Sequence, residues 1–422
     1  MRKPAIGFIF ITLMLDVMGF GLLIPVGPKL IQSLQGGTEA DAAKAVGFLA
    51  ATYSLMQFIF APTLGALSDR FGRRPVLLVA LLGSGLDYFA MALSPTLWFL
   101  FVTRAINGLS GASMTVASAY IADVTPPHKR AAGFGLIGAA FGLGFIIGPL
   151  VGGVLGGYNV RWPFYAAGII TLANWAYGFF VVPESLDDAH RRHFALSRAN
   201  PIAVFRGLSK YPAVIGLAGV LFFVNLAQFG LHAVWVLYTG HKFGWTPRDV
   251  GLSLFAVGIG AAVVQAGLAR RLIPMLGEKA ALLIGLGLGV VSYIGYGAAT
   301  HGWMIYAVLI LASLGGIGGP AAQSMITRTV RPDEQGAVQG ALTGLQSIAN
   351  ILGPLIGANI FAYFIQGRFA PPHDIPGAPF YSSAVLSAIG LAIALWAEHE
   401  VPSSAASEPE LQAVRTAESK PG

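Results

Sequence analysis

Three ionisable residues lie inside stretches of the chain that are otherwise strongly apolar: Asp16, Asp87 and Arg104. A charge in such surroundings is costly, so each position is a candidate for function. A carboxylic acid removed from water takes up a proton more readily than one in solution. Asp16 and Asp87 are therefore candidate proton carriers near neutral pH, and Arg104 would tune them by its fixed charge. A static buried ion pair is the structural alternative.

The spacing of two of these residues suggests that they lie at the same depth. Asp87 precedes Pro95 by eight residues, and Arg104 follows Pro95 by nine. With a turn at Pro95 and a rise of 1.5 Å per residue in a helix, each would lie roughly 12–13 Å from that turn. We therefore expect Asp87 and Arg104 to form an ion pair between adjacent helices. Asp16 is expected near the middle of its own helix.

The apolar stretches around these residues are long enough to cross a lipid bilayer. The chain has 422 residues, of which 55% are apolar and 11% charged, and its mean hydropathy is +0.69. A soluble domain has about 25% charged residues, and a helix needs about 20 apolar residues to span a bilayer. We predict an all-α membrane protein with twelve transmembrane helices, centred near Asp16, Met56, Gly85, Ser110, Phe145, Leu172, Asn225, Gly260, Gly289, Leu311, Ile348 and Gly390.

The predicted helices fall into two similar halves. A polar, basic segment, 184–211, separates residues 1–183 from residues 212–397, and the Ser/Pro/Glu-rich tail 398–422 is expected to be disordered. Val124-Thr-Pro126 followed by Gly148-Pro149-Leu-Val-Gly152 is echoed half a chain later by Val330-Arg-Pro332 followed by Gly353-Pro354-Leu-Ile-Gly357. Repeated halves around a central site are typical of secondary transporters. The predicted fold is therefore two pseudo-symmetric six-helix bundles.

The Lys and Arg residues predict how the chain is oriented. Apart from Arg104, most of the 26 are expected on one surface, and six are expected on the other: Lys29, Lys44, Arg161, Lys242, Arg248 and Arg368. Because basic residues collect in cytoplasmic loops, both termini and the central segment are expected in the cytoplasm. This bias also accounts for the net charge of +7 without nucleic-acid binding. The first apolar run contains Asp16 and lacks a signal-peptidase site, so we interpret it as a spanning helix.

A charged loop follows the second predicted helix and reads Gly65-Ala-Leu-Ser-Asp69-Arg70-Phe-Gly72-Arg73-Arg74-Pro75. Arg73 can pair with Asp123 at the end of the fourth helix, and Asp69 can face the positive N-terminus of a neighbouring helix. These interactions predict a latch. The alternative is a plain basic anchor on the cytoplasmic side, which would not need the ordered Gly and Asp positions.

The fifth predicted helix carries a dense glycine pattern, formed by Gly144, Gly148, Pro149, Gly152 and Gly153. Pro149 removes a backbone donor and can bend the helix, and the glycines allow another helix to approach closely. General small-residue packing is the alternative reading of the same pattern.

Further polar residues are expected near the middle of other spans. Those that could contact a substrate in a central cavity are Gln57, Asn107, Gln228, His232, Gln323 and Gln346, with Trp235 as an aromatic contact. The alternative for each polar side chain is a hydrogen bond between helices. For Trp235 the alternative is ordinary core packing.

These motifs resemble those of the major facilitator superfamily. The loop from Gly65 to Pro75 matches the loop signature of that family nearly residue for residue, and the glycine pattern of the fifth helix resembles the antiporter motif of drug–proton exchangers. Similarity to the tetracycline efflux proteins runs along nearly the whole chain, most clearly in residues 15–26, 55–62, 86–88, 234–237, 243–245 and 277–279.

The resemblance implies a function and a set of site residues. Tetracycline efflux proteins exchange a divalent-metal–tetracycline chelate for an incoming proton. The resemblance implies that Asp16, Gln57, Asp87 and Arg104 form the substrate and proton site. It also implies that a gating loop, formed by Asp69, Arg70 and Arg73 and joined by Gly65, Gly72 and Asp123, holds the outward-facing state.

The chain departs from this family at two positions. Tetracycline exporters carry a histidine in helix 8 and an aspartate in helix 9, where Ala261 and Gly289 stand here. The C-terminal half then has no acidic residue inside a span, so proton coupling would rest on Asp16 and Asp87. His232 could supply a titratable group, although a satisfied, non-titrating histidine is the alternative.

We therefore expect a proton-coupled exporter of an amphipathic drug, with tetracycline foremost. Export of another drug or metabolite, or import of a nutrient, are the alternatives. The chain lacks H-E-x-x-H, G-x-S-x-G and Walker motifs, so no enzyme and no catalytic residues are expected. With no cysteine, neither a disulfide nor a thiolate metal site can form.

The remaining expectations concern what the protein binds and where it resides. We expect no permanently bound cofactor and no metal site in the protein, with Mg²⁺ entering only as part of the substrate chelate. The expected partners are the lipid bilayer, a small-molecule substrate and protons. Nucleic acid is not expected as a partner, and the protein is expected to be a monomer. The expected location is a bacterial inner membrane, crossed many times.

Overall fold

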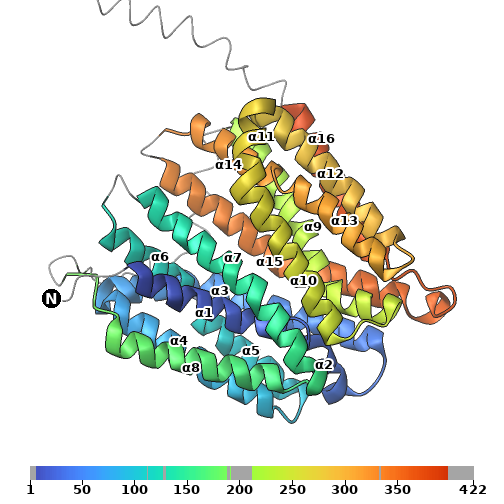
Figure 1. Cartoon of the computed structure of the whole chain (residues 1–422), viewed down its shortest axis with the longest axis horizontal. Helices are drawn as coiled ribbons and strands as arrows, with labels where there is room; N and C mark the ends of the chain where they lie inside the picture. The colour runs from blue at the N-terminus through green and yellow to red at the C-terminus, as the bar shows by residue number, and fades with distance from the viewer. Residues whose placement is uncertain are drawn as a thin grey trace, which may run out of the picture.

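The computed structural model describes residues 6–111, 113–126, 130–187, 191, 212–331 and 334–397, and these residues form helices without any strand (Figure 1). The predicted tail 398–422 and most of the predicted central segment 184–211 lie outside the described residues.

The helices form two groups, and the N-terminal group lies below the C-terminal group in Figure 1. The N-terminal group consists of α1 (Ile6–Leu23), α2 (Gly27–Gln35), α3 (Glu39–Phe71), α4 (Arg73–Leu93), α5 (Leu97–Ser110), α6 (Ser113–Val124), α7 (Arg130–Tyr158) and α8 (Trp162–Val181). The C-terminal group consists of α9 (Pro212–Phe243), α10 (Pro247–Val263), η5 (Val264–Leu268), α11 (Ala269–Leu276), α12 (Glu278–Ala298), α13 (Gly302–Gly315), α14 (Gly318–Thr329), α15 (Gln335–Phe364), η6 (Gly367–Phe369) and α16 (Ala378–Ala397).

The helix order agrees with the predicted twelve crossings. Among the described residues, nine helical stretches are long and apolar enough to span a membrane. A tenth candidate span is formed by α1 and α2 together, with a bend between them. The two other predicted crossings are interrupted helices, α5 with α6 and α10 through η5 to α11. All twelve predicted centres lie within helices. The all-α fold is confirmed, with the fourth, eighth and tenth crossings broken where continuous helices were expected.

The outer surface of the bundle is apolar, as a lipid solvent requires. Large apolar side chains are widely exposed, among them Trp98 at 75% and Trp303 at 69%. Each lies in the first turn of the helix that begins an interrupted crossing, α5 or α13. Exposing such side chains to water would cost about 25 cal/mol per Å², and lipid removes that cost.

The repeated sequence pattern makes the same contact in both halves. A Cβ atom at Gly148 of α7 would lie 2.9 Å from the Cα atom of Gly21 in α1. A Cβ atom at its counterpart in the repeat, Gly353 of α15, would lie 2.9 Å from the backbone nitrogen of Gly230 in α9. Backbones this close tolerate only glycine. The duplicated motif is therefore one packing device, used once in each half.

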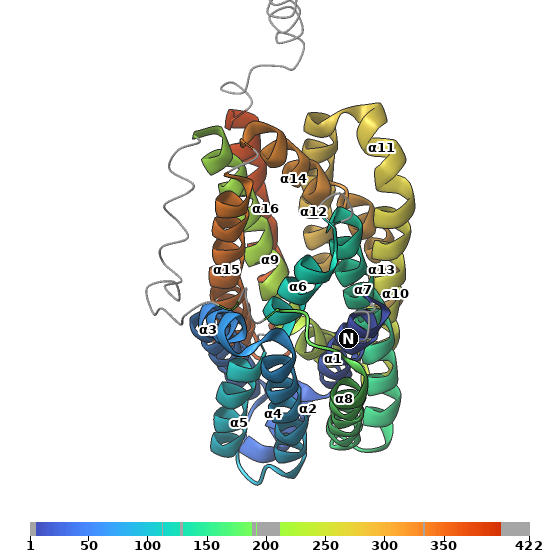
Figure 2. The same ribbon diagram turned by 90° about the vertical axis from the view of Figure 1, so that its left-hand side faces the viewer.

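Two pairs of helices make the most extensive contacts between the halves, α7 with α10 and α3 with α15. A Cβ atom at Gly153 would lie 2.9 Å from the Cα atom of Gly251, and one at Gly47 would lie 2.7 Å from the Cβ atom of Ala358. Both contacts lie toward the end of the bundle where α2 and the start of α3 are found, which we name the closed end. Figure 2 looks onto the opposite end, with α6 and α14, which we name the loop end.

Candidate functional site

The three charged residues predicted from sequence come together inside the N-terminal half. Asp16 lies on α1, Asp87 on α4 and Arg104 on α5. Tyr53 of α3 is within electrostatic range of Asp16 and Arg104, and Tyr88 of α4 is within range of all three charged groups. Four helices therefore contribute to one polar cluster, named here the charged cluster.

The expected ion pair between Asp87 and Arg104 does not form. The guanidinium carbon of Arg104 instead lies 6.0 Å from the ring centre of Tyr53, although Arg104 stays close enough to act electrostatically on Asp87. Asp87 is only 5% exposed. Its Oδ2 atom is buried without a hydrogen bond of good geometry, and the side-chain amide of Asn107 lies close to the carboxylate. An unsatisfied buried carboxylate oxygen is costly, so this atom is available to a proton or a substrate donor.

Gln57 shapes the helix interruption beside the charged cluster. Its Nε2 atom donates to the carbonyl oxygen of Gly111, at 2.8 Å, at the break between α5 and α6. A Cβ atom at Gly111 would lie 2.7 Å from the hydroxyl oxygen of Tyr53. A larger residue would disturb the break, so Gln57 and Gly111 together set where α5 ends, next to Asn107.

The C-terminal half presents a neutral polar group in place of charges. The Tyr293 hydroxyl of α12 donates to Oε1 of Gln228, at 3.1 Å, and Nε2 of Gln228 lies 2.8 Å from Nε2 of His232. Since the Gln228 oxygen already accepts from Tyr293, its amide donates to His232, which places the imidazole hydrogen on Nδ1. This arrangement fits a neutral, non-titrating histidine.

This neutral group faces the other half of the molecule. Gln228 and His232 lie in the middle of α9, yet their side chains are exposed. The ring of Phe145, from α7, lies 6.5 Å from the ring of His232. Tyr293 was missed by sequence reasoning, although a tyrosine hydroxyl within an apolar span was a signal that could have found it.

Other predicted substrate contacts lie elsewhere. Trp235 is 2% exposed, donates to the Ser253 hydroxyl at 3.1 Å and packs edge-on against Tyr296, so it is a core residue and the prediction of a substrate contact is corrected. Gln323 of α14 donates to Gln339 of α15 at 2.5 Å. Gln346 is exposed on α15.

The ion pair on which the predicted latch depends is present at the loop end. Arg73, only 8% exposed, pairs with Asp69 at 2.5 Å and with Asp123 at 3.0 Å, and donates to the Ser68 hydroxyl at 2.6 Å. The Arg73–Asp123 pair is as predicted. Asp69 instead pairs with Arg73 one turn away, rather than facing the N-terminus of a neighbouring helix.

The residue that meets a helix N-terminus here is Glu184, which sequence reasoning did not single out. Its carboxylate accepts from the backbone N–H groups of Arg73, at 2.9 Å, and Arg74, at 3.2 Å, in the first turn of α4. Gly72 has a φ of +102°, and any Cβ atom there would collide with Glu184. The positive φ and this close approach together explain the glycine. A Pro-Glu pair directly after an apolar helix was the available signal.

The latch network involves no residue of the C-terminal half. Ser68, Asp69, Arg73 and Asp123 belong to the N-terminal half and Glu184 begins the central segment, and the network is complete while the halves meet at the closed end. The remaining residues of the predicted gating loop lie outside it. Arg70 lies over the Phe71 ring at 5.0 Å, and a Cβ atom at Gly65 would come no closer than 3.8 Å to Thr115.

The glycine pattern of α7 connects the charged cluster to the contact between α7 and α10. We call this contact, and that between α3 and α15, the seams between the halves. A Cβ atom at Gly144 would lie 2.7 Å from the carbonyl oxygen of Met14 and 2.9 Å from the backbone nitrogen of Met18, on either side of Asp16. Gly148 and Gly152 also face α1, whereas Gly153 faces α10. Pro149 lies within α7, and its carbonyl oxygen would be 2.6 Å from a Cβ atom at Gly251. Any shift of α7 across the seam must therefore act on the helix that carries Asp16.

Within the part of the chain that the structure describes, no three His, Asp or Glu side chains converge as a metal-binding group would require.

Comparisons with known proteins agree with this architecture. The tetracycline resistance protein of class C from Escherichia coli is 42% identical over 352 residues, which cover 83% of this chain and 88% of that protein. The class G protein from Vibrio anguillarum is 39% identical over 358 residues, covering 84% and 89%.

Solved transporter structures share the fold. The human organic anion transporter MFSD10 is 25% identical, with a TM-score of 0.69 over 92% of this chain and 98% of that one. An inward-facing bacterial homologue of the human lysosomal transporter Spinster is 16% identical, with a TM-score of 0.74 over 93% and 96%, which is a likeness of fold alone. The profile of the Major Facilitator Superfamily matches residues 9–354 and, in an overlapping match, 220–420. The chain is therefore a multi-pass membrane transporter that belongs to the Major Facilitator Superfamily, and it is not an enzyme.

Proposed function

We propose that this chain exports an amphipathic, drug-like molecule, with tetracycline foremost, in exchange for protons. Relatives up to 42% identical are named tetracycline resistance proteins. We further propose that it acts as a monomer in a bacterial inner membrane, with both termini in the cytoplasm. The described basic residues support that orientation, because Lys29 and Arg248 lie at the closed end, whereas Arg73 and Arg74 lie at the loop end.

The observation that carries the proposal is the buried carboxylate of Asp87, which has one oxygen without a hydrogen bond of good geometry. A proton on this carboxyl removes the cost of a buried charge. A positively charged substrate group, such as a tetracycline chelate of Mg²⁺, would compete with that proton for the carboxylates of Asp16 and Asp87. The competition provides exchange, because substrate and proton cannot occupy the charged cluster together. The fixed positive charge of Arg104 weakens the binding of both the proton and the cationic substrate, and so favours their release.

Alternating access would follow from the two seams. The halves are held by α7 with α10 and by α3 with α15. A rocking of one half against the other around the central site is the movement expected of such repeats. In the proposed orientation, the closed end faces outward in this structure and the central site is reached from the cytoplasm.

A different organic substrate is the second candidate. Ala261 and Gly289 supply no ionisable group to the C-terminal half, and an organic anion transporter shares 25% identity over most of the chain. A neutral His232 group offers hydrogen bonds rather than charge to a substrate. We place this candidate after tetracycline because the tetracycline resistance proteins are much more similar in sequence.

The test is tetracycline resistance in a drug-sensitive bacterium that expresses the chain, with Asp87→Asn at equal membrane abundance as the control. Resistance that disappears in the control supports both the substrate and the site. Sensitivity despite normal abundance of the unaltered protein would refute tetracycline as substrate. A panel of organic anions and other drugs would then be assayed.

A further inference from the structure

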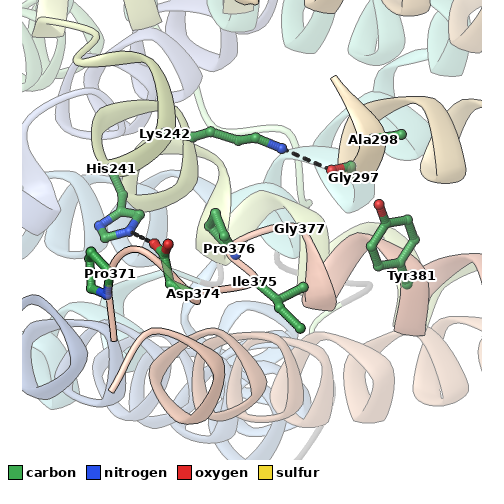
Figure 3. Close-up of a pocket in the computed structure, with 10 residues that line it drawn as sticks. All are labelled: His241, Lys242, Gly297, Ala298, Pro371, Asp374, Ile375, Pro376, Gly377 and Tyr381. Atoms are coloured by element: carbon green, nitrogen blue, oxygen red, sulfur yellow. Dashed lines mark hydrogen bonds and ion pairs between the residues drawn. The ribbon is translucent and has the colours of Figure 1, made fainter. Parts of the chain in front are cut away.

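A histidine bridges the two halves at the closed end. His241 lies in the last turn of α9, and its Nδ1 atom meets Oε2 of Glu39, the first residue of α3. Its Nε2 atom lies 2.5 Å from Oδ2 of Asp374, in the segment before α16 (Figure 3). Glu39 belongs to the N-terminal half, whereas His241 and Asp374 belong to the C-terminal half. The bridge therefore exists only while the halves are together at this end.

The chemistry of the bridge requires a proton. Carboxylates only accept hydrogen bonds, so both ring nitrogens of His241 must donate. A neutral imidazole has a single N–H, and only the imidazolium has two. Two charge-assisted hydrogen bonds to opposite sides of the ring are stronger than neutral ones. A neutral His241 would leave one carboxylate facing a nitrogen lone pair.

Water reaches this bridge. The side chain of Glu39 is 47% exposed, and those of His241 and Asp374 are 15% and 17% exposed. A cavity of about 540 Å³ lies beside them and is also lined by Lys242 and Tyr381 (Figure 3). Protons from the solution at this end can therefore reach His241.

The other titratable groups nearby have contacts of their own. Lys242 donates to the carbonyl oxygen of Gly297 at 3.0 Å, and it lies within electrostatic range of Asp374. On α3, Asp41 accepts from the Thr38 hydroxyl at 2.7 Å and is within electrostatic range of Lys44. His373 is exposed beside Asp374. Of the described groups on these elements, Glu39 and Asp374 are the acids that face His241 directly.

We propose that Glu39, His241 and Asp374 form a proton-dependent gate, which takes up one proton on His241 when the closed end shuts and releases it when that end opens. Histidine is suited to this role because it titrates between pH 5 and 8. In the proposed orientation, an acidic exterior favours closure and so drives the transporter back toward the cytoplasm for its next substrate. The gate rests on the alternating access proposed above, but not on the identity of the substrate.

The experiment uses the full chain in nanodiscs without any drug. The chain has no cysteine, so spin labels can be placed at Gln35→Cys on α2 and Arg248→Cys on α10, which are exposed at the closed end of opposite halves. Distance distributions are measured between pH 5.5 and 7.5 in the labelled parent, in His241→Gln and in Glu39→Gln. His301→Gln, at another histidine of the same end, is the control.

The gate predicts that the ratio of closed to open molecules rises as pH falls, by up to about tenfold per pH unit when closure takes up one proton. His241→Gln and Glu39→Gln should lose at least about two thirds of this pH dependence, and His301→Gln should keep it. If the folded His241→Gln variant keeps the pH dependence that the parent shows, the proposed gate is wrong. A failure of the parent to transport tetracycline in parallel assays would refute the proposed substrate and leave this readout unaffected.

Discussion

The two halves of this transporter share a fold and a packing motif but differ in the chemistry at their centre. Both use a Gly-Pro helix packed on the first helix of the half, through Gly148 on Gly21 and Gly353 on Gly230. The N-terminal half then places Asp16, Asp87 and Arg104 inside the bundle, whereas the C-terminal half places Gln228, His232 and Tyr293 there. The two halves share the framework, whereas the charged cluster lies in the N-terminal half and the neutral polar group in the C-terminal half. We infer that the N-terminal half couples to protons and that the C-terminal half selects the substrate.

The largest effect is expected from removing a charge of the N-terminal half. Asp16→Asn should reduce active drug efflux by about 100-fold or more, because an amide cannot carry a proton. The measurement is the initial rate of drug efflux from energised cells at matched membrane abundance. Asp249→Asn makes the same chemical change outside the charged cluster and should keep the parental rate. Near-parental efflux in Asp16→Asn would remove Asp16 from the coupling site.

The next effect concerns the seam that the two halves share. Gly153→Val should destabilise this structure by about 1–3 kcal/mol, because a Cβ atom there would lie 2.5 Å from the carbonyl oxygen of Pro247. Gly157→Val, one helical turn on, is the control, since nothing lies within 4 Å of a Cβ atom there. Thermal unfolding of both purified variants gives the comparison. Equal midpoints would show that the halves do not meet as described.

A smaller effect is expected at the latch of the N-terminal half, which differs in its residues from the Glu278–Arg328 pair, at 3.3 Å, of the C-terminal half. Glu184→Gln should cost about 1–2 kcal/mol, because the charged acceptor of two backbone N–H groups of α4 is lost. Transport should slow several-fold while the affinity for drug is retained. Asp187→Asn, three residues along, is the matched control and should behave as the parent in unfolding and transport. A wild-type unfolding midpoint in Glu184→Gln would show that the contact contributes nothing.

The smallest effect is expected from the neutral group of the C-terminal half. Tyr293→Phe removes the hydroxyl that orients Gln228 and, through it, His232. KM for the drug should rise about two- to tenfold, as the loss of one hydrogen bond predicts, with the maximal rate and the pH profile unchanged. A shifted pH profile would instead show that the C-terminal half takes part in proton coupling.

Much of the framework could be predicted from the sequence because it depends on local patterns. Apolar length, basic loops and the repeated Gly-Pro motif indicated twelve crossings in two halves, and Arg73 with Asp123 was predicted from residue type and position alone. Features that depend on distant packing were not predicted. Glu184 reaches α4 across 111 residues of sequence, and the interruptions of α5–α6 and α10–α11 depend on how neighbouring helices approach.

Residue types with two common roles were the source of the errors. Trp235 suits either a binding site or a core, and its hydrogen bond to Ser253 decides for the core. Asp87 and Arg104 have opposite charges at matching depth, but the side chain of Arg104 lies over Tyr53 instead of reaching Asp87. Equal depth on adjacent helices does not determine which way two side chains point.

The most direct test of the central claim is drug accumulation in proteoliposomes driven by an imposed pH gradient, with drug–drug exchange measured in the same vesicles. Asp87→Asn, in the N-terminal half, should lose gradient-driven accumulation and keep exchange, although with a weaker affinity for drug. His232→Gln, in the C-terminal half, should keep the dependence on the gradient and show only a weaker affinity for drug. Gradient-driven accumulation that survives in Asp87→Asn, or disappears in His232→Gln, would contradict the assignment of proton coupling to the N-terminal half.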